Sequence, residues 1–365
     1  MRLMEVIDHL EQIAPPSLQE SYDNSGLIVG DYSSEVRGIL ISLDCIEDTL
    51  KEAISKNCNV VIAHHPIVFS GLKRFNNANY VQRTVQLAIK NEIAIYAIHT
   101  NLDNVYQNGV NQKIAEKLGL INTRILTPKS GGLLKLVTYG PIAEVDEIKE
   151  ALFNAGAGNV GNYSECSFST LGEGTYMGNE SSNPVIGKRL IRQIEKEARI
   201  EVLLRDYQKS KVLKALNAVH SYEEVAYSMY RTENKDQNIG SGLVGDLTEN
   251  MQPAAFLSFL KSAMELEVIR FTKFNKTVRK VALCGGSGQF LLNNAMASNA
   301  DVFITGDFKY HQFFDAEEKL MICDIGHYES EKFTIDLLYD ILTKKFSKFA
   351  VLKTEEVTNP IKYFS

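Results

Sequence analysis

Two stretches of the chain alternate short β-branched runs with runs of helical periodicity, and this alternation constrains the fold more than any other feature. It is typical of strands joined by crossover helices, which build parallel sheets. In the first stretch we expect strands at 37–46, 59–65 and 93–103 and helices at 47–57, 80–92 and 109–120. In the second we expect strands at 278–286, 300–307 and 320–327 and helices at 254–265, 289–299, 309–320 and 330–346.

The segment between these stretches has a different texture, with glycines gathered in AGAGNVGNY and GEGTYMGN. It begins near TPKSGG at 127–132 and ends before the polar linker ENKDQNIGSG. A chain of 365 residues is long enough for two or three domains of roughly 150 residues. We therefore expect a discontinuous α/β domain with mostly parallel sheets, formed by residues 1–127 and 235–365, and an inserted α+β domain at 128–234.

Composition narrows the class of protein. The 39 Lys and Arg against 45 Asp and Glu give a net charge of -6, which argues against coating a nucleic acid with an open basic face. The five cysteines lie far apart without a C-x-x-C, which excludes a disulfide framework and a thiol zinc site. No leader opens the chain, and no apolar run approaches the roughly 20 residues that span a bilayer. We expect a cytoplasmic protein without a membrane partner, for which nucleic acid is the least favoured partner.

Histidines gather where ligands usually bind. Of the seven histidines, four lie at or just after the carboxyl end of a predicted buried strand: His64, His65, His311 and His327. Ligand crevices of open α/β sheets lie beyond these strand ends. Side chains alternate along an extended chain, so His64 and His65 can serve two ions, or one ion and a substrate. The alternative is one core histidine beside one surface histidine. A pair of histidines at a strand end, with further candidate ligands elsewhere in the chain, favours a metal site instead.

Two carboxylates complete the candidate site. His327 and Glu331 are four residues apart, so in a helix they share a face and can chelate one ion. Taken alone, Glu331 could simply be an acidic residue in the first turn of a helix, where the helix dipole favours a negative charge. Asp103 closes a predicted strand, where an Asx turn is an equally good explanation. His311 is a candidate acid or base beside the ions. Two divalent ions with water between them would use all five candidate ligands: His64, His65, Asp103, His327 and Glu331.

Two glycine-rich motifs are candidate phosphate-binding sites. GGSG at 285–288 lies between a strand and a helix, so its backbone N–H groups could hold an anion, or its glycines could form a tight turn. The sequence does not separate these alternatives. GSGLVG at 240–245 matches G-x-G-x-x-G, but it follows a polar linker and opens no helix, so we reject a dinucleotide site.

Taken together, the motifs resemble the Nif-three-like dinuclear-metal family, whose members are often described as GTP cyclohydrolase 1 type 2 homologues. The resemblance covers essentially the whole chain and implies metal ligands at the five positions found above. Tyr22 stands where the family usually has Trp. The motifs are YDNSGLIVG at 22–30, VIAHHPIVF at 61–69, IHTNLD at 98–103, ITGDFKYH at 304–311 and GHYESE at 326–331.

The middle segment resembles the insert of the longer bacterial members, a ferredoxin-like module related to PII and CutA proteins. Its motifs are ALFNAGAGNVGNY at 151–163 and HSYEEVAYSMY at 220–230, with Ser221 in place of the usual Pro. The resemblance assigns His220 to this module rather than to the metal site. It also implies a toroidal homohexamer built as a trimer of dimers.

The favoured hypothesis is a metal-dependent hydrolase in which two divalent ions activate a water against a small anionic or nucleotide substrate. Zinc is favoured, with manganese, iron and nickel as alternatives, and His311 is the candidate proton carrier. The family name implies opening of the imidazole ring of GTP. The alternative is a non-catalytic metal-binding scaffold or regulatory protein that acts through the toroidal oligomer.

Overall fold

The computed structural model describes residues 1–364 and separates into two compact units. The first, here the α/β unit, combines Met1–Thr127 with the segment that begins at Asn238. The second, here the insert unit, is Pro128–Gln237. Helices and strands mix in both, and the expected α/β class with mostly parallel sheets in the first unit is confirmed.

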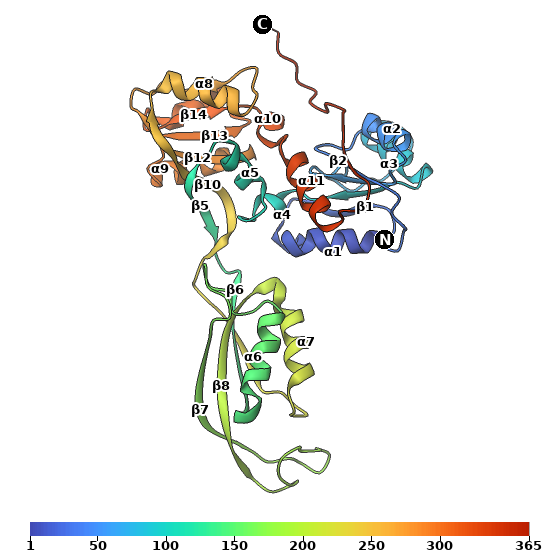
Figure 1. Ribbon diagram of the computed structural model, residues 1–365, viewed down its shortest axis with the longest axis vertical. Coiled ribbons are helices and arrows are strands. Elements are labelled where there is room, and N and C mark those ends of the chain that lie inside the picture. The colour runs from blue at the N-terminus through green and yellow to red at the C-terminus, as the bar shows by residue number, and fades with distance from the viewer. Residues whose placement is uncertain (365) are drawn as a thin grey trace. The chain divides into compact units, whose positions relative to one another are not determined.

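One sheet of the α/β unit has the strand order β1-β4-β3-β2-β15. Its strands β1 and β2 are labelled in Figure 1. Its strands are β1 (Gly26–Val29), β2 (Ile39–Ser42), β3 (Val60–Ala63), β4 (Ala94–Ala97) and β15 (Val351–Lys353). All pairs are parallel except the edge pair β1 and β4. Every residue of β2, β3 and β4 is buried, as expected for parallel strands covered on both faces.

Helices cover this first sheet. Leu50 of α2 and Val85 of α3 pack in one cluster with Leu40, Val61 and Ile95 of the strands. α11 packs against β2 and β15. The helices of this region are α1 (Leu3–Ile13), α2 (Glu47–Ser55), α3 (Tyr80–Lys90), α4 (Thr100–Asp103) and α11 (Thr334–Lys345), with the 3₁₀ helix η1 (Pro16–Leu18).

The second sheet of the α/β unit has the order β11-β14-β13-β12-β10-β5. β12, β13 and β14 are parallel, whereas β11 and β10 pair antiparallel at either side. Its strands are β5 (Ile121–Lys129), β10 (Asp236–Met251), β11 (Arg270–Phe271), β12 (Val278–Ser287), β13 (Val302–Gly306) and β14 (Met321–Asp324). Its helices are α5 (Val110–Lys117), α8 (Pro253–Ala263), α9 (Leu292–Ala297) and α10 (His327–Glu331), with η4 (Gln289–Leu291).

The helix expected at 309–320 is instead a short 3₁₀ helix, η5 (Tyr310–Ala316). The chain enters the left-handed region at Glu317 and Glu318, where φ is 48° and 54°. This turn ends the helix and lets Leu320 enter the same core cluster as Phe303 and Ala316. Burial of Leu320 therefore outweighs the helical periodicity of this segment.

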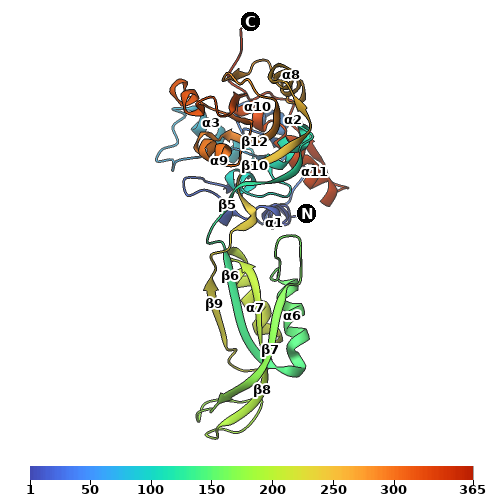
Figure 2. The ribbon, with the colours of Figure 1, turned by 90° about the vertical axis from the view of Figure 1, so that its left-hand side faces the viewer.

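The insert unit is a βαββαβ module (Figure 2). Its sheet has the order β7-β8-β6-β9 with antiparallel pairs, which is the ferredoxin-like arrangement. His220 is buried here, and its Nε2 donates to the carbonyl of Tyr139 at 2.8 Å. The elements are β6 (Leu133–Pro141), η2 (Ile142–Glu144), α6 (Val145–Asn154), β7 (Ser167–Tyr176), β8 (Gln193–Arg205), η3 (Asp206–Gln208), α7 (Lys209–Val219) and β9 (Tyr227–Arg231).

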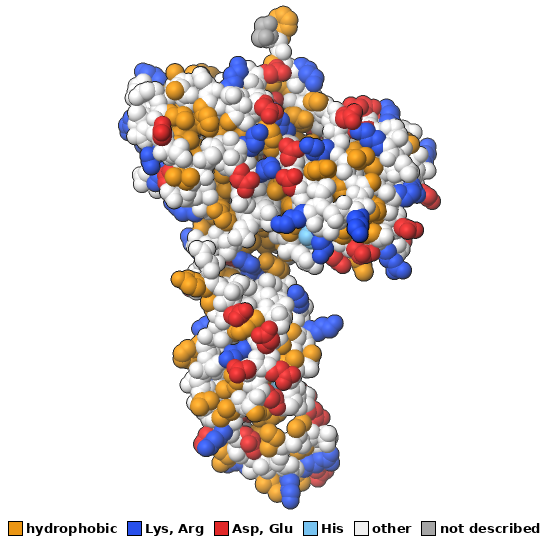
Figure 3. Space-filling view, viewed as in Figure 1, with side chains coloured by type: hydrophobic (Ala, Val, Ile, Leu, Met, Phe, Trp, Pro, Cys, Tyr) orange, Lys and Arg blue, Asp and Glu red, His pale blue; other side chains and the backbone are white. Residues whose placement is uncertain are grey.

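The surface carries charges of both signs. In Figure 3, Lys and Arg side chains are interspersed with Asp and Glu over the visible face. Among residues 1–364, each helix is either too short or too polar to cross a bilayer.

Candidate metal centre

The carboxyl ends of strands from both sheets of the α/β unit meet at one place. His64 and His65 leave β3 directly, and His327 opens α10 just after β14. Glu331 ends α10, one helical turn from His327, as the four-residue spacing predicts. Asp103 ends the short helix α4, which follows β4. The structure thus brings together all five candidate ligands named from the sequence.

His64 has the tautomer of a metal ligand. Its Nδ1 lies 2.8 Å from the carbonyl oxygen of Ile98. Because a carbonyl oxygen only accepts, Nδ1 carries a proton, and in the neutral imidazole the lone pair is then on Nε2. The His64 side chain is fully buried, so this lone pair faces the interior of the site.

His65 and His327 are oriented in the same way by carboxylates. Nδ1 of His65 lies 2.8 Å from Asp44 Oδ1, and Nδ1 of His327 lies 2.7 Å from Asp307 Oδ2. A carboxylate on Nδ1 fixes the ring and makes Nε2 a better ligand, an arrangement common among metal-binding histidines. Each of these imidazoles therefore presents Nε2 to the site.

Glu331 lies at the centre of the cluster. Its Oε2 is 3.0 Å from Nε2 of His65 and 3.2 Å from Nε2 of His327, and its Oε1 is 3.7 Å from Nε2 of His64. The side chain is only 2 % exposed. Burial opposes its ionisation, but hydrogen bonds from His327 and the neighbouring imidazoles outweigh burial and hold the pKa of Glu331 well below its usual value. The carboxylate is therefore charged and available to an ion.

Asp103 faces His64 across a gap that suits an ion. Its Oδ1 lies 3.6 Å from Nε2 of His64, and both atoms are buried without a hydrogen-bond partner. Burial, together with the charge of Glu331, raises the pKa of Asp103 to about 7. A cation would satisfy both orphaned atoms and favour the ionised carboxylate. The site therefore fits a divalent ion.

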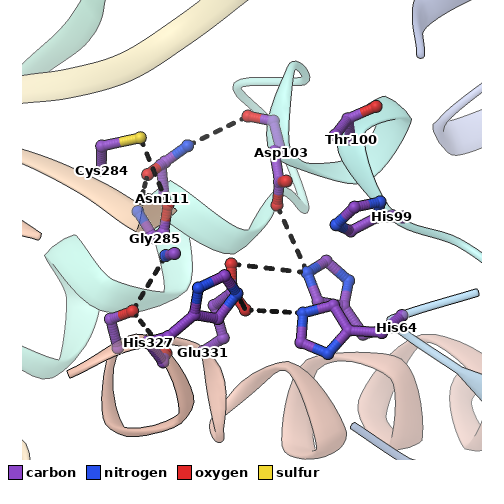
Figure 4. A network of polar contacts seen from close by, with 12 residues as sticks. His64, His99, Thr100, Asp103, Asn111, Cys284, Gly285, His327 and Glu331 are labelled. Carbon is purple, nitrogen blue, oxygen red and sulfur yellow. Dashed lines mark hydrogen bonds and ion pairs between the residues drawn. The ribbon is translucent and has the colours of Figure 1, made fainter. Parts of the chain in front are cut away.

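The ligand atoms form two overlapping groups, as Figure 4 shows for Asp103 and Glu331, whose carboxylates point toward His64. One group is His65, His327 and Glu331, and the other is His64, Asp103 and Glu331, with the atoms of each group within 4.8 Å of one another. Glu331 belongs to both groups. Nitrogen and carboxylate ligands of this kind suit zinc, manganese, iron and nickel.

His99 is a member of the site that the sequence did not single out. Its ring lies 5.3 Å from those of both His64 and His65, and the three can form a further ligand group. Its Nδ1 is 2.8 Å from Asp23 Oδ1, so its Nε2 is also left for the site. His99 is the second residue after β4, just as His65 is the second residue after β3, and this position is the signal that could identify it.

The expected strand at 93–103 ends early, because β4 stops at Ala97 and α4 begins at Thr100. The cause is Asp23, whose carboxylate accepts from the backbone N–H of Thr100 at 3.0 Å and from its hydroxyl. This capping starts a helical turn that the sequence pattern does not show. Asp103 therefore reaches the cluster from a helix rather than from a strand end.

Three backbone N–H groups of the GGSG segment at 285–288 are already hydrogen-bonded, so they are not free to bind an anion. Backbone N–H groups donate from Gly285 to Asn111, from Gly286 to Ser330 and from Gly288 to Thr305, each at 2.9 Å. Gly286 has a φ of 62°, and a Cβ there would lie 2.4 Å from Oε1 of Glu331. Residues 285–287 form the end of β12, where the pairing with β13 is irregular. The glycines therefore serve the backbone path rather than an anion, and the absence of a Cβ at Gly286 makes room for Glu331. GSGLVG at 240–245 lies inside β10.

His311 lies apart from the cluster. It is exposed on η5, and its ring neighbours are Tyr310, at 5.1 Å, and Phe314, at 6.5 Å. It is not among the residues that line the cavity beside the cluster, which has a volume of about 1270 Å³. The cluster contributes His65, His99, Asp103, His327 and Glu331 to that lining.

Comparisons with known proteins agree with this architecture. The sequence model of the Duf34/NIF3 (NGG1p interacting factor 3) family matches residues 1–360. Two relatives are each named "GTP cyclohydrolase 1 type 2 homolog". The one from Halalkalibacterium halodurans is 38% identical over 325 residues, with 88% of this chain and 87% of the relative covered. The one from Bacillus subtilis is 34% identical over 370 residues, with 98% of each chain covered.

Solved structures give the same result. A Bacillus cereus protein related to NIF3 has a TM-score of 0.88 at 36% identity, with 100% of this chain and 99% of that chain covered. A Staphylococcus aureus protein has a TM-score of 0.78 at 29% identity, with the same coverage. These matches confirm the resemblance predicted from the motifs. The chain belongs to the Duf34/NIF3 (NGG1p interacting factor 3) family.

Proposed function

We propose that the protein holds two divalent metal ions in this cluster and is a metal-dependent hydrolase of a small substrate that enters the adjoining cavity. The observation that carries the proposal is the central position of Glu331, which is shared by two groups of ligand atoms. A carboxylate can bridge two ions, whereas a neutral imidazole with one free nitrogen cannot. Zinc is the favoured ion, with manganese, iron and nickel as alternatives.

The chain's own residues have separable roles in this proposal. His65, His327 and Glu331 would hold one ion, and His64, Asp103 and Glu331 the other. Two ions held in this way would supply an acidified water and positive charge against an anionic transition state. Asp44 and Asp307 keep Nε2 of their histidines directed at the site.

His99 faces the cavity from beside the cluster, with its ring fixed by Asp23. It is therefore the imidazole best placed to contact a substrate. The role of His311 as a proton carrier stays a prediction. Since His311 is exposed and outside the cavity lining, that role would need a neighbouring copy in the proposed homohexamer.

A second candidate function is a metal-binding scaffold, and one observation favours it. The cluster joins the two sheets of the α/β unit, because His64 and His65 follow β3 whereas His327 and Glu331 follow β14. Ions at this junction would tie the two sheets together without any reaction. The wide cavity beside the cluster favours the enzyme over the scaffold.

The enzyme is tested by assaying hydrolysis of GTP, nucleosides and phosphoesters with chelated and with zinc- or manganese-reconstituted protein. We expect turnover of at least one substrate only with ions, and a loss of about 100-fold or more in Glu331→Gln. Glu318→Gln is the matched control, because Glu318 is an exposed carboxylate outside the cluster. Metal-loaded protein that turns over nothing in the panel would favour the scaffold.

A further inference from the structure

We infer that the cavity beside the metal cluster takes a planar aromatic compound without a phosphate chain, held by stacking on the aromatic wall and by its own metal-ligating oxygen or nitrogen atoms. This inference rests on the proposed function, because it assumes ions at the cluster. It narrows the small substrate of the proposed function to one class of compound and replaces the anionic or nucleotide substrate expected from the sequence.

The charges on the cavity wall are the first observation. Of the residues in the described chain that line it, none is Lys or Arg. Carboxylates line it instead: Glu20, Asp44, Asp103 and Glu331. Sites for triphosphates normally combine metal ions with Lys, Arg or free backbone N–H groups. Two divalent ions would carry a charge of +4, and the four carboxylates together carry -4. The wall would therefore offer a polyphosphate no net positive charge.

At the GGSG segment, backbone N–H groups do not replace the missing cations. Two glycine-rich segments reach this cavity: GGSG at 285–288, with Gly285 and Ser287 in the lining, and GSGLVG at 240–245, with Ser241 and Gly242. In GGSG, three N–H groups already donate to the side chains of Asn111, Ser330 and Thr305. A phosphate at the GGSG segment would have to displace these hydrogen bonds, and displacing them would disturb the backbone that makes room for Glu331.

Aromatic rings form the other part of the wall. Tyr22, Phe69, Tyr80 and Phe290 line the cavity, and each is more than half exposed. The ring of Phe69 lies 5.7 Å from that of His99, so it stands directly beside the cluster. Exposed aromatic faces stack planar rings, and such stacking has a large effect on affinity. A flat compound on Phe69 would therefore lie within reach of the ligand atoms.

Lys73 and Arg74 offer a rival source of phosphate binding. They follow Leu72, which lines the cavity, and both are exposed on the same loop. A phosphate chain that left the cavity along this loop could meet them. The test therefore includes Lys73→Ala/Arg74→Ala.

The test measures binding of guanosine, GMP and GTP to zinc-saturated protein by equilibrium dialysis, with the zinc content of the protein measured afterwards. These probes share one base and differ in their phosphates alone. We expect guanosine to bind at least as tightly as GTP. We expect Phe69→Ala to lower the affinity for guanosine by about tenfold or more. Phe75→Ala is the matched control, because Phe75 is an exposed ring nearby that does not line the cavity.

GTP binding about tenfold or more tighter than guanosine would overturn the inference, and loss of that difference in Lys73→Ala/Arg74→Ala would identify the cause. The inference would also be overturned if zinc-loaded parent protein bound none of the probes. The same holds if the Phe69→Ala variant bound guanosine as tightly as the parent. Both results leave the proposed function intact, since the zinc remains bound. Parent protein that takes up no zinc would instead contradict the proposed function itself.

Discussion

Nε2 of His64 lies 3.6 Å from Oδ1 of Asp103, and neither buried atom has a hydrogen-bond partner. A buried polar group left in this state costs about 1 to 3 kcal/mol of folding free energy. A divalent ion between the two atoms would satisfy both. Metal binding and folding stability would therefore be coupled at this contact.

The first prediction concerns that coupling. Saturating zinc is expected to raise the free energy of unfolding of the chelated protein by about 4 kcal/mol for each bound ion at a thousandfold excess over Kd. His64→Ala should lose the gain from one of the two ions, because it removes one of the three ligands of the group formed with Asp103 and Glu331. Urea unfolding of both proteins, with zinc and with chelator, measures the difference. Equal gains in parent and variant would show that His64 holds no ion.

The second prediction concerns the carboxylate behind His327. Asp307→Asn is expected to weaken metal binding by about 10-fold or more, because the charge that orients Nδ1 of His327 is lost. Asn is the proper replacement, since Asp307 has a φ of 62° and Asn tolerates this conformation. A competition titration against a chromophoric chelator gives the affinity. Asp315→Asn, at an exposed position on η5, should bind like the parent.

The third prediction concerns Gly286. Gly286→Ala places a Cβ 2.4 Å from Oε1 of Glu331 and should displace this carboxylate from both groups of ligands. Gly119→Ala is the control, because Gly119 has a similar φ of 59° and open space around its Cβ position. Both variants should lose about 1 to 2 kcal/mol of stability from the backbone conformation. Metal content should fall in Gly286→Ala alone, and retention of the parent's content there would contradict the central role of Glu331.

The fourth prediction concerns pH. Burial would lower the pKa of His65 from 6.5, but hydrogen bonds to Asp44 and Glu331 outweigh it and raise the pKa to about 9. A protonated His65 with a raised pKa stabilises the fold. This stabilisation is fully present below pH 6.5 and is lost as the pH rises through about 9. The chelated parent should therefore lose stability relative to chelated Glu331→Gln across this window.

Metal should reverse that trend, because ions compete with protons for the same imidazoles. The affinity for zinc is expected to rise with pH over the range in which the chelated parent loses its relative stability. Urea unfolding at several pH values, with and without zinc, checks both signs. A difference between the chelated parent and Glu331→Gln that does not change with pH would mean that His65 and Glu331 do not interact in solution.

The parts of the site that local pattern fixes could be predicted from the sequence. Buried β-branched runs place His64 and His65 at a strand end, and parallel strands bring such ends to one edge. The four-residue spacing of His327 and Glu331 likewise fixes their relation in α10. These rules require no knowledge of distant contacts.

The parts of the site that depend on long-range hydrogen bonds could not be predicted from the sequence. Asp23 both orients His99 and starts α4, yet it is 76 residues away from His99 in the chain. The pairing of Asp307 with His327 crosses 20 residues in the same way. The antiparallel strands β1 and β10 were missed for a related reason, since they do not take part in the strand and helix alternation that reveals the parallel strands.

The most direct test is the metal content per chain, measured by inductively coupled plasma mass spectrometry on protein purified without chelator or a His tag. The parent is compared with His327→Ala/Glu331→Ala, which removes the ligand shared by both groups. About two equivalents in the parent and a clear loss in the variant are predicted. Parent and variant both near zero, even after incubation with excess zinc or manganese, would contradict the dinuclear centre.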